Sequence, residues 1–249
     1  MLLAAIQFKA DKGDRAGSQA RLLSLCEQAA AQGASLVVCP EMAMTGYLFR
    51  DADDVRRVAE PVDGPSFALL SQFAAVRGCT VVCGYPERVS GDGSERLYNS
   101  AWIIGPDGKL LYNYRKRLLY DADMTWAAPG DTPYPLVRSP AGSLSAGICM
   151  DLNDDAFIAY LQEAKAHVVA FCTNWLEEGH DLYFYWRYRL LSVPSYFVAA
   201  NTYGDEVCPG HEPTRFAGQS VIFDPRGRVL ASAPPSGDAV ITAKIRVPR

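Results

Sequence analysis

Short apolar runs alternate with segments of helical periodicity along the chain. Residues 2–8 form an apolar run typical of a buried strand, and residues 19–32 repeat apolar side chains at helical spacing before Gly33. Residues 35–39 form a second apolar run. This order predicts a β-α-β unit at the start of the chain.

The alternation continues to the end of the chain. In the first half we expect a helix over residues 66–76, a strand over 79–84 and a hairpin over 101–112, where Gly-Pro-Asp-Gly supplies the turn. In the second half we expect strands over 144–149, 168–172 and 196–201, helices over 154–165 and 182–191, and a hairpin over 220–231. The pattern of each half therefore predicts a β-α-β unit followed by a hairpin. This repetition favours an α/β sandwich with pseudo-symmetric halves, in which two sheets stack and helices cover their outer faces. We expect a single domain over residues 1–249, because no linker divides the halves.

Composition and charge narrow the choice of partner. Of the 249 residues, 49% are apolar and 21% are charged, which permits a packed core. The net charge of -4 and the absence of a basic block beyond residues 115–117 argue against nucleic acid or an anionic membrane as a partner. We therefore expect a small molecule or a peptide as the substrate.

Features of the termini and cysteines predict a cytoplasmic protein. The first residues lack the basic lead of a signal peptide, and no apolar run is long enough to span a membrane. The seven cysteines are odd in number and scattered, as in proteins of a reducing compartment. Cys79 and Cys83 are closely spaced, but none of the three histidines lies in a ligand-like pattern, so we expect no metal and no cofactor.

Three residues whose side chains could take part in a reaction follow predicted strands: Glu41, Lys116 and Cys149. Each also has an ordinary alternative, because Glu41 could be a solvated loop charge, Lys116 an exposed basic residue and Cys149 a buried core thiol. Cys149 precedes a predicted helix with Asp151 and Asn153 as cap candidates, and the partial positive charge of a helix N-terminus lowers a thiol pKa. A glutamate base, a cation for the developing oxyanion and a cysteine nucleophile form a complete set for acyl transfer.

The same residues lie in motifs that resemble those of the nitrilase superfamily of carbon-nitrogen hydrolases. The glutamate, lysine and cysteine motifs correspond to residues 39–47 (CPEMAMTGY), 114–119 (YRKRLL) and 147–151 (GICMD), in the same order and spacing. Supporting matches lie at residues 5–8, 84–87, 98–100, 129–130, 173–175, 201 and 216–220. The resemblance implies a four-layer αββα sandwich.

The resemblance also implies roles for individual residues. It makes Glu41 the general base and Cys149 the nucleophile that forms a thioester, with Lys116 and the backbone N–H of Met150 stabilising the tetrahedral intermediate. Asp123 is the best counterpart of a second active-site glutamate, although its side chain is one methylene shorter. Tyr47, Asn174 and Trp175 lie in matching motifs and are expected to contact the substrate.

Within the superfamily, residues 115–126 and 147–153, with Trp186 and Arg189, look most like the protein N-terminal amidase branch. That branch deamidates asparagine or glutamine at the N-terminus of peptides. A carboxylate could hold the α-ammonium group of such a substrate, and the candidates in nearby loops are Asp121, Asp123, Asp151, Glu177 and Glu178. Most of these could equally be solvated loop charges, and Asp151 could instead cap the helix.

Other functions remain open from sequence. One is hydrolysis of small free amides, by an ω-amidase or an N-carbamoyl amide hydrolase, for which Arg187 or Arg189 could hold a substrate carboxylate. Another is a nitrilase-like binding protein without turnover. The resemblance also implies a homodimer formed through the helix after the nucleophile, where Phe157, Ile158 and Tyr160 could face a partner or the core.

Overall fold

The computed structural model describes residues 1–91 and 93–246, and it contains two six-stranded sheets. The first sheet has the order β14-β1-β2-β3-β4-β5, and the second has the order β13-β12-β9-β8-β7-β6. The first is built from β1 (Leu2–Gln7), β2 (Ala34–Val38), β3 (Thr80–Gly91), β4 (Ser94–Ile104), β5 (Leu110–Arg115) and β14 (Ala239–Lys244). The second is built from β6 (Val137–Ser139), β7 (Gly142–Ile148), β8 (Val168–Thr173), β9 (Tyr196–Asn201), β12 (Val221–Phe223) and β13 (Val229–Ser232).

Strand pairing in the two sheets follows the same plan. Parallel pairs join β1 to β2 and β2 to β3 in the first sheet, and β7 to β8 and β8 to β9 in the second. Antiparallel strands then extend each sheet, β4 and β5 in the first and β12 and β13 in the second. The predicted pseudo-symmetry of the two halves is therefore confirmed.

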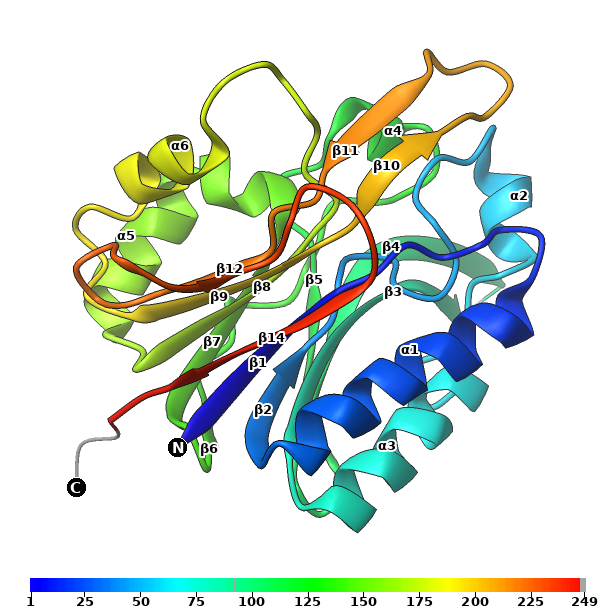
Figure 1. The fold of residues 1–249 in the computed structure, drawn as a ribbon. Helices are drawn as coiled ribbons and strands as arrows, with labels where there is room; N and C mark the ends of the chain where they lie inside the picture. Colours follow the sequence, from blue (N-terminus) through cyan, green and yellow to red (C-terminus); the bar gives the residue numbers. More distant parts are fainter. Residues whose placement is uncertain (92, 247–249) are drawn as a thin grey trace.

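Helices cover the outer faces of both sheets. The helices α1 (Arg15–Ala31) and α3 (Pro65–Arg77) lie on the first sheet, and α5 (Asp155–Ala164) and α6 (Leu182–Arg189) lie on the second (Figure 1). Along β1, Leu3 and Ala5 point toward the second sheet, whereas Ala4 and Ile6 point toward α1 and α3. Strands buried on both faces explain the nearly continuous apolar runs in the sequence, and they confirm the αββα layering.

Local capping explains where the helices begin. Helix α1 begins four residues before the predicted position because the Asp14 side chain accepts a hydrogen bond from the N–H of Gly17. Helix α3 begins at Pro65 and ends before Gly78, whose φ of 65° is in the left-handed region. The predicted bounds of this second helix differ by one residue at each end.

Several elements lie outside the predictions. They are β14, β6, the short helices α2 (Ala52–Arg56) and α4 (Asp121–Met124), and a separate hairpin of β10 (Tyr203–Glu206) and β11 (Thr214–Ala217). The strand predicted over residues 79–84 extends to Gly91. Figure 1 shows α4 and the β10–β11 hairpin together at one end of the molecule, above the strand ends.

The helix after Cys149 presents its large apolar side chains to the core. Phe157 is fully buried and Ile158 is nearly so, and a Cβ at Gly147 would lie 2.5 Å from the Phe157 ring. For Phe157 and Ile158 the structure favours the core-facing alternative, because both pack inside this chain, whereas Tyr160 is only partly buried. The large apolar side chains exposed nearby belong to Phe184, Tyr188 and Leu191, in and just after α6. Homodimer formation stays a prediction.

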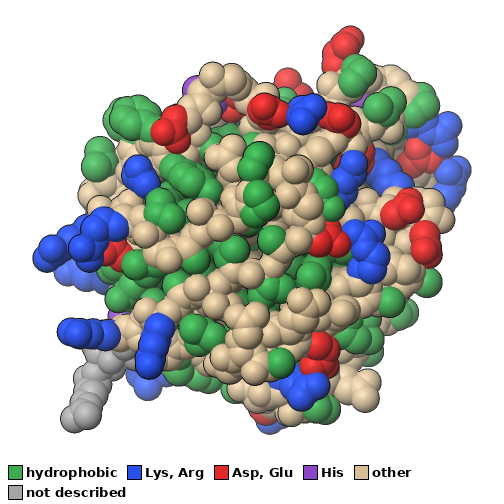
Figure 2. Space-filling view, in the orientation of Figure 1, with side chains coloured by type: hydrophobic (Ala, Val, Ile, Leu, Met, Phe, Trp, Pro, Cys, Tyr) green, Lys and Arg blue, Asp and Glu red, His purple; other side chains and the backbone are tan. Residues whose placement is uncertain are grey.

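Two further observations concern possible partners of the protein. Within residues 1–91 and 93–246, no helix combines the length and the apolar character needed to cross a membrane. Along the upper edge of Figure 2, where Figure 1 places α4 and the β10–β11 hairpin, acidic and basic side chains are intermixed.

Candidate active site

The three candidate residues follow strands from both sheets and are all buried. Glu41 follows β2, Lys116 follows β5 and Cys149 follows β7. The Lys116 Nζ lies 2.8 Å from the Glu41 Oε1, and the charges of both groups act on the Cys149 thiol. The structure therefore brings together the three residues that sequence reasoning selected.

Glu41 is held by hydrogen bonds from three sources. Besides Lys116, the Asn99 Nδ2 donates to Oε1 at 2.7 Å, and the backbone N–H of Asn174 donates to Oε2 at 2.9 Å. Burial raises the pKa of Glu41, and the positive charge of Lys116 opposes the rise. A carboxylate in these surroundings can accept a proton from a neighbouring thiol. The close approach of Gly84 supports this position, because a Cβ there would lie 2.5 Å from the Glu41 Cα.

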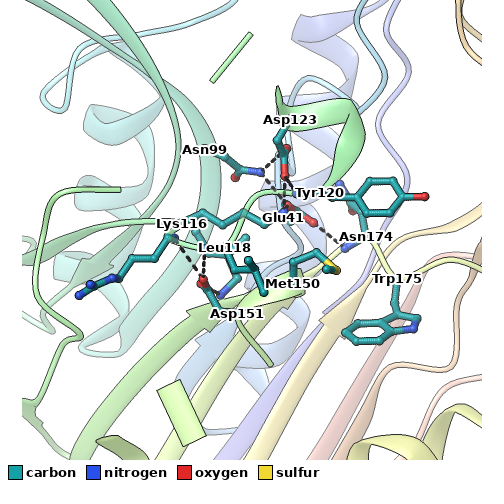
Figure 3. Close-up of polar contacts among 12 residues, drawn as sticks. Glu41, Asn99, Lys116, Leu118, Tyr120, Asp123, Met150, Asp151, Asn174 and Trp175 are labelled. Atoms are coloured by element: carbon teal, nitrogen blue, oxygen red, sulfur yellow. Dashed lines mark hydrogen bonds and ion pairs between the residues drawn. The ribbon is translucent and has the colours of Figure 1, made fainter. Parts of the chain in front are cut away.

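Asp123 forms the fourth member of the buried cluster. Its Oδ2 lies 2.6 Å from the Lys116 Nζ and accepts the N–H of Tyr120, and its Oδ1 accepts a hydrogen bond from Asn99. The shorter aspartate side chain reaches Lys116 because α4 carries its backbone to the cluster. Figure 3 shows the side chains of Asn99 and Lys116 meeting the carboxylates of Glu41 and Asp123, to which both donate.

Lys116 retains its positive charge between these carboxylates. Burial alone would lower the pKa of Lys116, but the charges of Asp123 and Glu41 outweigh it and raise the pKa above its usual range. Two carboxylates thus surround one ammonium group. The fixed cation can stabilise negative charge that develops on a substrate oxygen.

Cys149 occupies a strained turn between β7 and the 3-10 helix η1 (Cys149–Asn153). Its φ of 43° lies in the left-handed region, which costs a non-glycine residue on the order of 1 kcal/mol. Burial raises the pKa of the Cys149 thiol, the charge of Glu41 adds to the rise, and Lys116 opposes it. The expected lowering of this pKa is therefore wrong: the helix α5 begins only at Asp155, and burial dominates. A thiol whose pKa is raised holds its proton more tightly, so it needs a neighbouring base to act as a nucleophile.

Asp151 does not face the pocket. Its Oδ1 accepts the backbone N–H groups of Arg117 and Leu118, the second of which is labelled in Figure 3. Its Oδ2 accepts the N–H of Ile148 and the hydroxyl of Tyr114. Burial raises the pKa of Asp151 to about 6. The expectation that Asp151 binds substrate is therefore corrected, because the fully buried carboxylate already accepts four hydrogen bonds. Through these hydrogen bonds Asp151 connects the loop after Lys116 with the turn that carries Cys149.

A pocket with a volume of about 400 Å³ opens beside Cys149. The predicted residues Tyr47, Met150, Asn174 and Trp175 line it. The other lining residues are Tyr120, Asn153, Leu176, Glu178, His180 and Tyr185. Of these, the sequence singled out only Glu178, as one of five candidate carboxylates for an α-ammonium group, and Asn153, as a helix-cap candidate. The sequence could have located Tyr120 at the pocket, because it lies in the motif that contains Asp123. Tyr185 lies in a helix whose sequence pattern indicates only packing against the core.

The two arginines proposed for a substrate carboxylate point elsewhere. Arg189 donates to the backbone oxygen of Leu152 and pairs with Asp155, and the Arg187 guanidinium lies 5.2 Å from the centre of the Phe223 ring. Neither lines the pocket beside Cys149. In residues 1–91 and 93–246 there is also no group of three or more His, Cys, Asp or Glu side chains arranged to hold a metal ion.

Comparison with known proteins assigns the family. The family model for carbon-nitrogen hydrolases matches residues 2–249. The chain belongs to the carbon-nitrogen hydrolase family. Among solved structures, this hydrolase resembles an amidase from Nesterenkonia sp. AN1 with a TM-score of 0.81 and 21% identity, covering 99% of this chain and 93% of that one. That structure shows acrylamide added to the active-site cysteine of a variant of the amidase.

Curated relatives of this hydrolase include both bacterial and fungal proteins. The hydrolase in the pqqF 5′ region of Pseudomonas protegens is 33% identical over 88% of this chain and 74% of its own length. The protein N-terminal amidase of Saccharomyces cerevisiae is 34% identical over 50% of this chain. This second match spans only 31% of the yeast protein.

Proposed function

We propose that this chain is a thiol amidase that hydrolyses primary amides and acts on asparagine or glutamine at the N-terminus of peptides. The observation that carries the proposal is the buried cluster of Glu41, Lys116 and Asp123 beside Cys149, which itself lines an open pocket. The pairing of a base, a fixed cation and a thiol suits acyl transfer.

The first half of the proposed reaction forms a thioester. The Cys149 sulfur bonds to the amide carbon as its proton passes to Glu41, and the oxygen becomes an oxyanion beside Lys116 and the backbone N–H of Met150. The C–N bond then breaks, and Glu41 returns the proton to the leaving nitrogen, which departs as ammonia. The acyl group remains on the Cys149 sulfur.

The second half restores the enzyme. Glu41 removes a proton from a water molecule that attacks the thioester carbon, and a second tetrahedral intermediate forms at the same oxyanion position. This intermediate expels the thiolate, which recovers its proton from Glu41. The product is a carboxylic acid, so that N-terminal glutamine becomes glutamate.

Two observations support a peptide over a small anionic amide. Two fungal relatives are named protein N-terminal amidase, at 34% and 33% identity over about half of this chain. Within the described part of the chain, no lysine or arginine is among the residues that line the pocket, and the charge of the buried Lys116 is already paired with Glu41 and Asp123, so a substrate carboxylate would find no unpaired cation there. Free glutamine and carbamoyl amino acids both carry such a carboxylate.

The test measures ammonia from Gln- and Asn-initiated peptides beside free glutamine, with mass spectrometry of the peptide product. We expect faster release from the peptides and conversion of their first residue to the acid. Equal or greater release from free glutamine would contradict the peptide proposal. No release from any primary amide would contradict the amidase itself.

Glu206 should act as a positioning residue for the wall of this pocket. Its carboxylate accepts the backbone N–H groups of Tyr47 and Leu48 and pairs with Lys12. Glu206→Ala removes that support, and we expect kcat/KM to fall about 10-fold, because small displacements of substrate-contacting groups are costly. Steady-state kinetics on an N-terminal glutamine peptide provide the measurement.

The matched control is Glu212→Ala, since Glu212 is exposed on the same hairpin connection. Its kinetics should equal those of the wild type. Glu206→Gln keeps one acceptor oxygen and should recover part of the loss. Identical kinetics for Glu206→Ala and Glu212→Ala would show that Glu206 does not position the wall.

A further inference from the structure

The pocket wall carries a negative side chain without a lysine or arginine to balance it. Among the pocket-lining residues in the described ranges, Glu178 is the single carboxylate and none is lysine or arginine. The His180 Nε2 lies 3.7 Å from the Glu178 Oε2, which is longer than a hydrogen bond. Glu178 thus presents acceptor oxygens at the pocket.

The loop geometry explains why Glu178, and not its neighbour, reaches the pocket. The backbone N–H of Glu177 donates to the carbonyl of Arg215 at 2.8 Å, and the Glu177 Oε2 lies 2.8 Å from the Arg215 Nε. Leu176 forms a bridge with Phe216 on the same hairpin. These contacts direct Glu177 to β11, so that the next residue along the loop turns to the pocket.

Aromatic rings form much of the pocket wall around this carboxylate. Tyr47, Tyr120, Trp175 and Tyr185 all line the pocket, and Figure 3 shows Tyr120 and Trp175 on the same side of the site as Met150. The Trp175 and Tyr185 rings lie 5.8 Å apart, and the Tyr185 hydroxyl is fixed by a hydrogen bond to Asn153. Aromatic faces attract cations, as does a carboxylate.

We propose that Glu178 binds the α-ammonium group of the substrate and thereby selects amides that carry a neighbouring positive charge. This inference rests on the proposed amidase function and adds the residue that recognises a free peptide N-terminus. Glu178 also disfavours an anionic group at this position, because like charges repel. An amide with a carboxylate near the same position is therefore a poor substrate.

The test compares a Gln-initiated peptide with its Nα-acetylated form. The wild type should prefer the free amine about 10-fold or more in kcat/KM, as expected for a charge-assisted hydrogen bond. Glu178→Gln should lose that preference, through a higher KM for the free-amine peptide and unchanged kinetics for the acetylated one. Glu178→Lys should instead favour the Nα-succinyl peptide, which carries a carboxylate.

Glu212→Gln is the control, because Glu212 is an exposed carboxylate between β10 and β11 that does not line the pocket. It should keep the wild-type preference. Equal kcat/KM of the wild type on free and acetylated peptides would overturn the role of Glu178 and leave the amidase proposal standing. An equal fall on both peptides in Glu178→Gln would also overturn it. No ammonia from either peptide with the wild type would overturn the amidase proposal, and this inference with it.

Discussion

Replacing Cys149 with alanine should reduce ammonia release on the order of 10⁴-fold or more, as for the loss of a nucleophile in other covalent hydrolases. The reason is that no other group at the base of the pocket can form the acyl intermediate, since Glu41 is bound by Asn99 and Lys116. Initial rates on an N-terminal glutamine peptide provide the measurement. Thermal unfolding should show an intact fold.

Cys79→Ala is the matched control for this prediction. Cys79 is buried like Cys149, but it lies just before β3 and does not line the pocket. The variant should keep wild-type kinetics despite the loss of a core thiol. Ammonia release at the wild-type rate from Cys149→Ala would refute the thioester mechanism, and a comparable loss in Cys79→Ala would point to damage of the fold.

The sequence predicted the fold well wherever the signal was local. The strand over residues 196–201 was predicted with the observed bounds, because an apolar run between polar segments marks a strand buried on both faces. Strand β14 was missed, since its pairing with β1 joins residues at opposite ends of the chain. The β10–β11 hairpin was missed because residues 203–206 (YGDE) show no apolar alternation.

The site residues also differ in how far the sequence alone could place them. The positions of Glu41, Lys116 and Cys149 after apolar strands mark them as candidates in the sequence. Their meeting depends on how the two sheets stack, because Cys149 follows a strand of the second sheet. The place of Asp123 depends on how α4 packs, so side-chain length alone was a poor guide. Asp151 was misjudged for a related reason: its distance along the chain from Cys149 does not reveal that it turns back to the backbone of Arg117.

Replacing Lys116 with methionine should destabilise the protein by about 3–5 kcal/mol near neutral pH, the usual cost of removing one partner from a buried ion pair. Methionine has a similar length but no charge, so Glu41 and Asp123 would remain buried beside an apolar group. Amide hydrolysis should be lost as well, because the cation that faces the oxyanion is gone. Urea unfolding monitored by circular dichroism measures the stability.

The pH dependence of the lost stability follows from the protonation of Glu41. Burial raises the pKa of Glu41, and removing the lysine charge removes an influence that opposes the rise. A carboxyl group whose folded-state pKa exceeds the unfolded value of about 4.3 contributes stability when protonated and loses it as the pH rises. The stability gap between wild type and Lys116→Met should therefore be widest near neutral pH and narrow as the pH falls through the raised pKa toward the unfolded value.

Two variants isolate the charge effect. Lys109→Met removes an exposed lysine that pairs with Asp107, and it should leave unfolding unchanged. Adding Glu41→Gln to Lys116→Met removes one of the two uncompensated carboxylates, so the double variant should be more stable than Lys116→Met alone. A stability gap that does not change with pH, or a double variant that is less stable than the single one, would mean that Lys116 stabilises the core by packing. The predicted recovery would instead show that its charge permits two carboxylates to remain buried together beside the nucleophile.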